Sequence, residues 1–466
     1  MALNQADQKN VGWEPVSGAS RTRFAVLAFL CGAAVIAYLQ RNCLGTAEST
    51  IRADLDLTKQ EMGWLISSFF WAYAIFQIPT GWLSDRWGPR RALTTYATGW
   101  SLASVVMALA GTVFTSFILG WFGIAVSSVA WLWFIAARIL GGAAQAGLFP
   151  SAASVLSGWM PRNRRAIGSG FIGGSQQIGG LLAAMLTAYL IDIADIHWRL
   201  ILVIFAVPGF FWAAWFWRWF RNHPSEHSQV NAAELQLLGA AEKKQSSRPT
   251  ATPWLILACS PATWCICGQQ FCRGFGYIFY STWFPTYLQE THGVSIAESG
   301  FLSALPLMFV LVAAPLGGTI SDSLLDKTGS HRIARSFFGA ICLGGCAMFI
   351  FIAYFVSHPT LAVLVISAGS FCAGLIGPVA YATTIDMAGK HVATVFGTMN
   401  MSGNIGAAIF PLVVPVLLRV GGMGGEENWD LVLFAFAGVY AIGAFFWLFL
   451  NPRGTMVEHS LRRVYS

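Results

Sequence analysis

The chain has 466 residues, of which 56% are hydrophobic and only 11% carry a charged side chain. Soluble proteins carry about a quarter charged residues, so the composition excludes an ordinary soluble enzyme and indicates an integral membrane protein. The formal net charge of +7 is spread over loops, where it bears on membrane orientation and does not indicate nucleic acid as a partner.

A membrane-spanning helix needs about 20 mainly apolar residues. Segments of this kind are predicted at 24–46, 62–83, 92–111, 128–150, 166–191, 198–218, 262–288, 296–321, 335–356, 360–386, 392–418 and 429–450. The polar stretch 219–253 divides them six and six. The sequence therefore predicts an all-α membrane protein with twelve transmembrane helices in two six-helix bundles.

Basic residues in short loops mark the cytoplasmic side of a membrane protein. Lys and Arg gather in the loops on the N-terminal side, and the opposite loops keep Arg52, Lys59, Arg199 and Arg419. Both termini are therefore expected in the cytoplasm, and the linker is expected to be a solvated segment or a surface helix. The expected divisions are a cytoplasmic tail at 1–23, a first bundle at 24–218, a cytoplasmic linker at 219–261, a second bundle at 262–450 and a cytoplasmic tail at 451–466.

The apolar stretch 112–127 does not fit this count. The arginines at 90–91 and at 162–165 must face the same compartment, so an even number of spans separates them. We therefore expect this stretch to be an outer hairpin or a lengthening of the third and fourth helices.

No metal site or cofactor is expected. Cys265, Cys267 and Cys272 lie close together, but they lack a histidine and the CxxC spacing of zinc sites. They are better explained as small apolar packing residues. An enzyme in the membrane would need acids, histidines or metal ligands inside the spans, and the sequence places none there.

Three arginines lie inside the predicted spans without a carboxylate beside them: Arg41, Arg138 and Arg273. A charge within the bilayer is costly and usually marks the path of an ion or substrate. Three cations without a partner indicate that the missing counter-ion is the substrate. The sequence therefore predicts a transporter for an organic anion.

A Gly/Asp/Arg loop occurs at the matching place in each half of the chain. The residues 81–91, GWLSDRWGPRR, join the second and third spans, and a weaker copy begins at 318. Its repetition suggests two related bundles, and an Asp at a helix end that pairs with arginines suits a gate on the cytoplasmic side. The expected gating residues are Asp85, Arg86, Gly88, Arg90, Arg91, Asp322, Arg332, Arg335 and Asp386.

The first of these loops resembles the motif of the major facilitator superfamily. Further segments resemble its anion:cation symporter family, which includes hexuronate, galactonate and glucarate transporters, sialin and the vesicular glutamate transporters. They are residues 70–81, 138–141, 149–150, 271–273, 283–288 and 400–404. The resemblance implies the major facilitator fold, with the arginines of the first, fourth and seventh spans facing a central cavity.

The spacing of polar residues points to the same cavity. Gln269, Arg273, Tyr277 and Tyr280 follow one stripe of a helix, and their donors and aromatic rings suit a carboxylate on a hydroxylated body. Interhelical hydrogen bonding is the alternative for the asparagines, and reaching toward a helix end is the alternative for Arg138. The expected substrate-binding residues are Arg41, Arg138, Arg273, Tyr73, Gln145, Tyr277, Tyr280, Asn400 and Asn404.

Two positions depart from the family pattern. Proton-coupled members resembling this chain carry an acid directly before the first-span arginine and another seven residues after the fourth-span arginine. Gln40 and Gln145 occupy these positions here, and an amide cannot titrate. This favours weak proton coupling, exchange, efflux or another cation, with Glu48 and Asp386 as the remaining acids able to carry a proton.

The predicted function is alternating-access transport of a small organic anion, a sugar acid such as a hexuronate, aldonate or aldarate. Inorganic phosphate or an amino-acid-like anion is the alternative substrate, and a substrate sensor with a transporter fold is the alternative of another class. The expected partners are the anion, a coupling ion (proton or sodium) and the lipid bilayer. The protein is expected to be a monomer in the inner membrane of the cell.

Overall fold

The computed structural model describes residues 18–112, 126–161, 165–238, 260–388, 392–421 and 428–452. Within these ranges the chain is helical and forms no β-strand. The predicted outer hairpin at 112–127 falls almost wholly outside the described residues.

The first bundle contains six membrane-crossing units. Their bounds are α1 (Thr22–Thr46), α3 (Lys59–Trp87), α4 (Pro89–Ala108), α6 (Val126–Ala146) continued by α7 (Leu148–Trp159), α8 (Arg165–Ala188) continued by the π-helix η2 (Tyr189–Ile193), and α9 (Trp198–Trp219). The short helix α2 (Glu48–Asp54) lies between α1 and α3.

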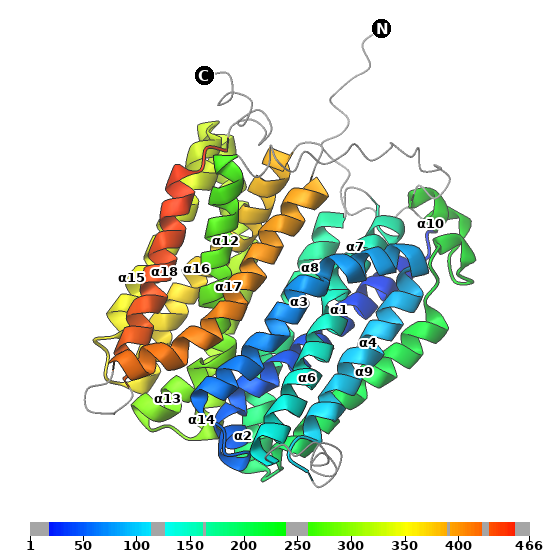
Figure 1. Cartoon of the computed structure of the whole chain (residues 1–466). Coiled ribbons are helices and arrows are strands. Elements are labelled where there is room, and N and C mark those ends of the chain that lie inside the picture. The colour runs from blue at the N-terminus through cyan, green and yellow to red at the C-terminus, as the bar shows by residue number, and fades with distance from the viewer. Residues whose placement is uncertain are drawn as a thin grey trace.

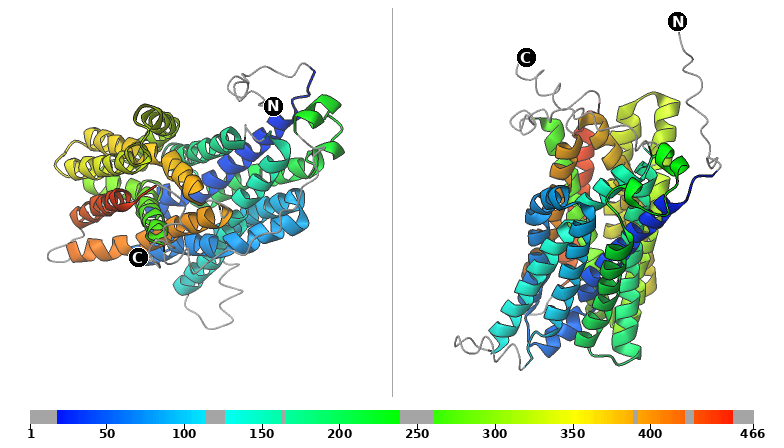
Figure 2. Two further views of the ribbon diagram at one scale, coloured as in Figure 1. Left: turned by 90° about the horizontal axis from the view of Figure 1, so that it is seen from above. Right: turned by 90° about the vertical axis from the view of Figure 1, so that its right-hand side faces the viewer.

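The second bundle also contains six units, which confirms the predicted twelve for the described part of the chain. They are α12 (Pro261–Thr282) continued by α13 (Phe284–His292), α14 (Ile296–Thr328), η4 (Arg332–Phe337) continued by α15 (Phe338–Ala353), α16 (Pro359–Ala388), α17 (Val392–Gly421) and α18 (Asp430–Phe449). Figure 1 and the view from above in Figure 2 show the two bundles side by side.

Nine of the described helical units are long and apolar enough to cross a membrane by composition alone. The three that are not are α3, α4 and α12, which carry the loop motif or the polar stripe around Arg273. Polar residues with an expected function therefore lower the hydropathy of these three helices.

The main contacts between the bundles join α3 to α17 and α8 to α14. Helix α1 also contacts α12 and its continuation α13. We call the end of the molecule where α1 begins and α18 ends the proximal face, at the top of Figure 1, and the opposite end, with α2 and α13, the distal face.

Part of the linker forms a short helix that is docked to the first bundle. Glu234 of the helix α10 (Ala232–Leu237) is 0% exposed. Its carboxylate accepts hydrogen bonds from the backbone N–H groups of Thr22 at 3.3 Å and Arg23 at 3.1 Å. The linker thus supplies the anion that satisfies the first N–H groups of α1.

Close helix contact within the second bundle depends on Gly317. A Cβ atom added there would lie 1.8 Å from the carbonyl oxygen of Leu375 on α16, whereas one added at Gly344 of α15 would meet no atom within 4 Å. Small residues at such crossings let helix backbones approach in lipid.

We predict that Gly317→Ala lowers the thermal unfolding temperature, because overpacking costs about 1–3 kcal/mol. Gly344→Ala is the matched control, and it should leave stability unchanged or slightly raised, since Ala favours a helix over Gly. Thermal unfolding in detergent measures both. Equal stability of the two variants would contradict the close approach at Gly317.

Candidate substrate site and gates

Arg41 is held in the first bundle by an amide and by aromatic rings. Its side chain is 8% exposed on α1, and its Nε donates to Oε1 of Gln145 on α6 at 3.0 Å. The guanidinium carbon lies 4.4 Å from the ring centre of Tyr38, 4.8 Å from that of Phe69 and 4.7 Å from that of Tyr73. No carboxylate of the described residues pairs with this charge. Gln145 is fixed in turn by donating from Nε2 to the carbonyl of Ala37 at 3.1 Å.

Arg138 serves a different purpose from Arg41. It is 2% exposed on α6, and its Nε donates to the backbone carbonyl of Leu65 on α3 at 3.1 Å. The ring of Phe69 lies 4.5 Å from its guanidinium carbon, so this ring contacts both Arg138 and Arg41. In this structure Arg138 ties α6 to α3 and supports the ring that faces Arg41.

Arg273 extends from α12 of the second bundle and is half-buried. Its guanidinium packs against the backbone of Gly377 on α16, where an added Cβ would lie 2.8 Å from one terminal nitrogen. The ring of Tyr381, one turn further along α16, lies 5.9 Å from the guanidinium carbon. Among the described residues Arg273 has no hydrogen bond or ion pair, so its donors are available to a ligand.

Two tyrosines join the surroundings of these arginines across the bundle interface. The hydroxyl of Tyr277 on α12 donates to Oε1 of Gln177 on α8 at 2.8 Å, and Tyr277 lies one turn from Arg273 on the same helix. The ring centre of Tyr73 on α3 lies 4.7 Å from the guanidinium carbon of Arg41. The structure therefore brings Arg41, Arg273, Tyr73 and Tyr277 into one region between the bundles.

Tyr280 lies elsewhere, which corrects its assignment to the polar stripe. It is 1% exposed in the core of the second bundle, 5.5 Å from the ring of Phe436. Three residues turn an α-helix by about 300°, so Tyr280 lies about 60° around α12 from Tyr277. Gln269, near the same angle as Tyr280, is also buried and donates to the carbonyl of Ile266 at 3.0 Å.

Asn400 and Asn404 are half-buried on α17. Asn404 Nδ2 donates to the carbonyl of Asn400 at 3.0 Å. One turn further along, the carbonyl of Ala408 accepts a hydrogen bond from Ser67 of α3. Residues spaced by four share a helix face, so both asparagines lie on the face of α17 that approaches α3.

Gln40 faces the interior of the first bundle. Its Nε2 donates to the carbonyl of Phe205 on α9 at 2.8 Å, and its Oε1 accepts from Ser104 of α4 at 3.0 Å. Of the two amides at the positions that depart from the family pattern, only Gln145 contacts Arg41.

The expected gating residues of the second bundle come together at the proximal face. The Arg335 guanidinium lies 3.1 Å from a carboxylate oxygen of Asp322 and 3.8 Å from one of Asp386, and it donates to Ser321 Oγ at 2.8 Å. These contacts join α14, η4 and α16 within one bundle and do not cross the interface.

The matching residues of the first bundle are arranged differently. Arg90 donates from Nε to the carbonyl of Trp217 on α9 at 2.9 Å, and Asn222 of the linker accepts from the backbone N–H of Arg90 at 2.9 Å. Gly88 has a φ of +79° in the tight turn between α3 and α4, a conformation that favours glycine. Arg86, Arg91 and Arg332 are exposed, and the side chain of Asp85 lies outside the described part of the chain.

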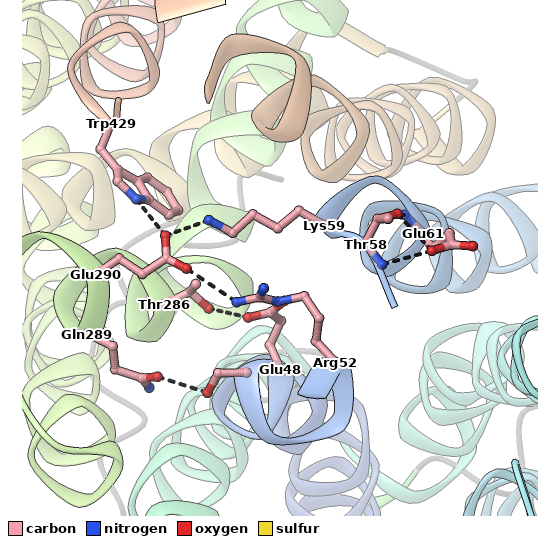
Figure 3. A network of polar contacts seen from close by, with 10 residues as sticks. Glu48, Arg52, Thr58, Lys59, Glu61, Thr286, Gln289, Glu290 and Trp429 are labelled. Atoms are coloured by element: carbon pink, nitrogen blue, oxygen red, sulfur yellow. Dashed lines mark hydrogen bonds and ion pairs between the residues drawn. The ribbon is translucent and has the colours of Figure 1, made fainter. Parts of the chain in front are cut away.

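A polar network at the distal face was not predicted from the sequence (Figure 3). Glu290 on α13 accepts from Lys59 Nζ at 2.6 Å, from Arg52 at 3.3 Å and from Trp429 Nε1 at 3.0 Å. Glu48 on α2 accepts from Arg52 Nε at 2.9 Å and from Thr286 Oγ1 at 2.8 Å. We call these six residues the distal gate, because they join α2 and α3 of one bundle to α13 and the start of α18 in the other.

Backbone contact closes the distal face further. A Cβ added at Gly45 of α1 would lie 2.1 Å from the carbonyl oxygen of Ser281, and one added at Gly63 of α3 would lie 2.5 Å from that of Pro411. Among the described residues, the hydrogen bonds and ion pairs that join the bundles lie in the distal half or at the level of Tyr277. The structure therefore has a closed distal side.

Two helical bundles that meet along one interface, with contacts concentrated at one end, form the architecture of membrane transporters built from two related halves. The chain belongs to the Major Facilitator Superfamily, whose family model matches residues 30–354 and 324–463.

Three relatives of this chain carry the names of organic-acid transporters. The chain is 29% identical over 434 residues to the probable sulfoacetate transporter SauU of Cupriavidus necator, covering 93% of this chain and 94% of the relative. It is 27% identical to the probable galactarate/D-glucarate transporter GudP of Bacillus subtilis, with 92% of each chain covered. It is also 27% identical to the D-galactonate transporter of Escherichia coli, covering 87% and 92%.

Solved structures share the fold at low sequence identity. A bacterial homolog of the human lysosomal transporter Spinster, in an inward-facing conformation, has a TM-score of 0.68 at 18% identity and covers 96% of both chains. A D-xylose-proton symporter has a TM-score of 0.68 at 16% identity, with 92% of this chain and 97% of that chain covered.

We predict that Gly45→Ala shifts the population toward a form with an open distal side, because the added methyl group collides with a backbone carbonyl only when the bundles are closed there. Spin labels at Ala53 and Ser357, exposed residues at the distal ends of the two bundles, report the distance between the bundles. The native cysteines are replaced first. Gly173→Ala is the control, since a Cβ there meets nothing within 4 Å, and identical distance distributions in all three proteins would argue against this closure.

Proposed function

We propose that this transporter moves a small organic anion, a sugar acid such as a hexuronate, aldonate or aldarate, by alternating access. The observation that carries the proposal is the pair Arg41 and Arg273, which approach one region from opposite bundles without a carboxylate partner among the described residues. A guanidinium forms strong paired hydrogen bonds with a carboxylate. The organic-acid substrates in the names of the relatives support the same class.

The neighbouring groups suit the hydroxylated body of a sugar acid. Tyr73 and Tyr277 offer hydroxyl groups and ring faces, and Gln145 holds Arg41 in place. Asn400 and Asn404 add amides on the side of α17, and Arg138 acts indirectly through Phe69. The Asp322–Arg335–Asp386 cluster and the loop from Asp85 to Arg91 are proposed to stabilise the proximal ends of the bundles during the cycle.

We further propose that the protein is a monomer in the inner membrane with its proximal face in the cytoplasm. The basic residues on that side support this orientation. The two tails, 1–23 and 451–466, and the linker 219–261 then lie in the cytoplasm, and the bundles correspond to 24–218 and 262–450. Entry of an anion against an inside-negative potential costs about 2.3 kcal/mol per charge per 100 mV, so import requires a coupling cation such as a proton or sodium, a protonated substrate or an exchanged anion.

We predict that Arg41→Ala and Arg273→Ala each weaken binding of the transported acid by about 10- to 150-fold. Hydrogen bonds to charged groups contribute about 1.5–3 kcal/mol, and each 1.4 kcal/mol is a factor of ten in affinity. Isothermal calorimetry with sugar acids, dicarboxylates, sulfoacetate and phosphate measures the effect, and proteoliposome uptake separates transport from binding by a sensor.

Two further arginine variants serve as controls for this experiment. Arg332→Ala changes an exposed arginine at the proximal face and should bind like the wild type. Arg138→Gln removes a contact to backbone carbonyls, so it should lower thermal stability more than it changes which acids bind. Near-normal affinity in both Arg41→Ala and Arg273→Ala would remove these arginines from the site.

We predict that Gln145→Glu makes anion binding depend on pH. A carboxylate at this position pairs with Arg41 and competes with the substrate, and protonation removes the competition. Binding to the variant should therefore be weak at pH values above the pKa of the introduced carboxyl group and should recover below it. Gln145→Asn is the matched control without a titratable group. Parallel pH profiles of Gln145→Glu and the wild type would contradict the contact between residue 145 and the substrate-binding arginine.

A further inference from the structure

The distal gate contains a buried carboxylate at an interface that has to separate. Glu48 is 0% exposed, whereas Glu290 is 30% exposed in the same network. Alternating access requires the bundles to part at this end when the distal side opens. The contacts of Glu290 with Arg52 and Lys59, and that of Glu48 with Thr286, cross the interface and are lost in that step.

We propose that Glu48 is a proton-binding site of the distal gate, and that it takes up a proton from the distal solution as the bundles close over it. The step adds one proton to the carboxylate and removes one negative charge from the gate. The inference needs a protein that opens and closes at this end, and it does not depend on which anion is carried.

The surroundings of Glu48 explain why closure favours the proton. Arg52 lies on the same helix and remains near Glu48 whether the gate is closed or open, so its stabilisation of the carboxylate changes little. Closure removes water from the carboxylate and brings the negative charge of Glu290 toward it, and both favour the protonated form. The hydrogen bond from Thr286 opposes them, but a hydroxyl can also accept a hydrogen bond from a protonated carboxyl.

The balance among these effects favours protonation in the closed form. Burial raises the pKa of the Glu48 carboxyl above its ordinary value, and the opposing effects of Arg52 and Thr286 do not cancel this rise. When the gate opens, Glu48 is hydrated and its pKa returns toward about 4.3. The conformation in which Glu48 has the higher pKa gains population as pH falls, so low pH stabilises the closed gate. This stabilisation begins when the pH falls to the pKa of Glu48 in the closed form. It reaches its full value below the ordinary pKa of a glutamate.

Other charged groups nearby are separated from Glu48. Lys59 is bonded to Glu290, and Ser49 and Gln289, which pair at 2.8 Å, are neutral. Asp54, on the same short helix, pairs with Arg199 at 2.6 Å and lies 3.8 Å from His197, all within the first bundle. His197 is therefore the competing titratable group to be tested.

The test measures the distal distance of the substrate-free protein between pH 8 and pH 5, with the spin labels at Ala53 and Ser357. In the wild type the closed-to-open ratio should rise as pH falls, by about tenfold for each unit of pKa difference between the two forms. Glu48→Gln should remain mainly closed with no pH dependence, since the amide resembles the protonated carboxyl. Glu48→Asp, which keeps a titratable group, should retain a pH response if Glu48→Gln fails to fold.

Two controls identify the titrating group. Glu290→Gln should open the gate further at every pH but keep the pH response, and His197→Gln should behave like the wild type. A wild type without pH response, a pH response that persists in Glu48→Gln, or one that vanishes in Glu290→Gln or His197→Gln would overturn the proposal. Because no substrate is present, these results leave the proposed anion transport to be judged by the binding experiments.

Discussion

The burial of positive charge without a matching acid is the constraint on which the centre of this molecule depends. A guanidinium within a bilayer needs hydrogen-bond acceptors or aromatic faces to offset its lost hydration. Arg138 meets this need with backbone carbonyls of α3, and Arg41 meets it with one amide and a set of rings. Because rings attract a cation without neutralising it, Arg41 remains attractive to an anion, whereas Arg138 has become part of the scaffold.

The interface between the bundles is also under a physical constraint. Its contacts must be strong enough to hold the distal side closed and weak enough to let the bundles separate. The distal half achieves this with glycines that allow backbone contact and with a polar network at the edge. Partly exposed ion pairs contribute roughly 0–1 kcal/mol each, so no single contact locks the closed form. One hydrophobic core lies within the first bundle, whereas a larger one contains residues of both bundles, such as Phe69 and Phe279, so part of its packing changes when the bundles part.

The repeated architecture could be predicted from the sequence because it depends on local features. These are the length of the apolar segments, the charge of the loops and a recurring Gly/Asp/Arg loop. The sequence did not predict roles that depend on which side of a helix faces which neighbour. Tyr280 shares a stripe with Arg273, about 20° around the helix, yet it lies two turns further along α12, where it is buried beside Phe436. Glu234 reads as one charge in a polar linker, and only the fold brings it to α1. The sequence contains a weak indication of the distal gate. Arg52 and Lys59 are two of the few basic residues on that side, and Glu290 lies shortly after the WFPTYL segment.

The residues proposed to bind the anion and the acid proposed to respond to pH lie in different parts of the molecule. At the centre, Gln145 contacts Arg41, and Gln40 is hydrogen-bonded inside the first bundle. Both side chains are amides, which do not titrate, so neither can take up or release a proton near Arg41. At the distal edge, Glu48 is an acid that is fully buried in the closed form. An acid at the centre would pair with Arg41 and compete with the anion, whereas an acid at the gate can respond to pH without weakening the site. A proton can therefore bias the conformational equilibrium from a position where it does not alter the charge that the substrate meets.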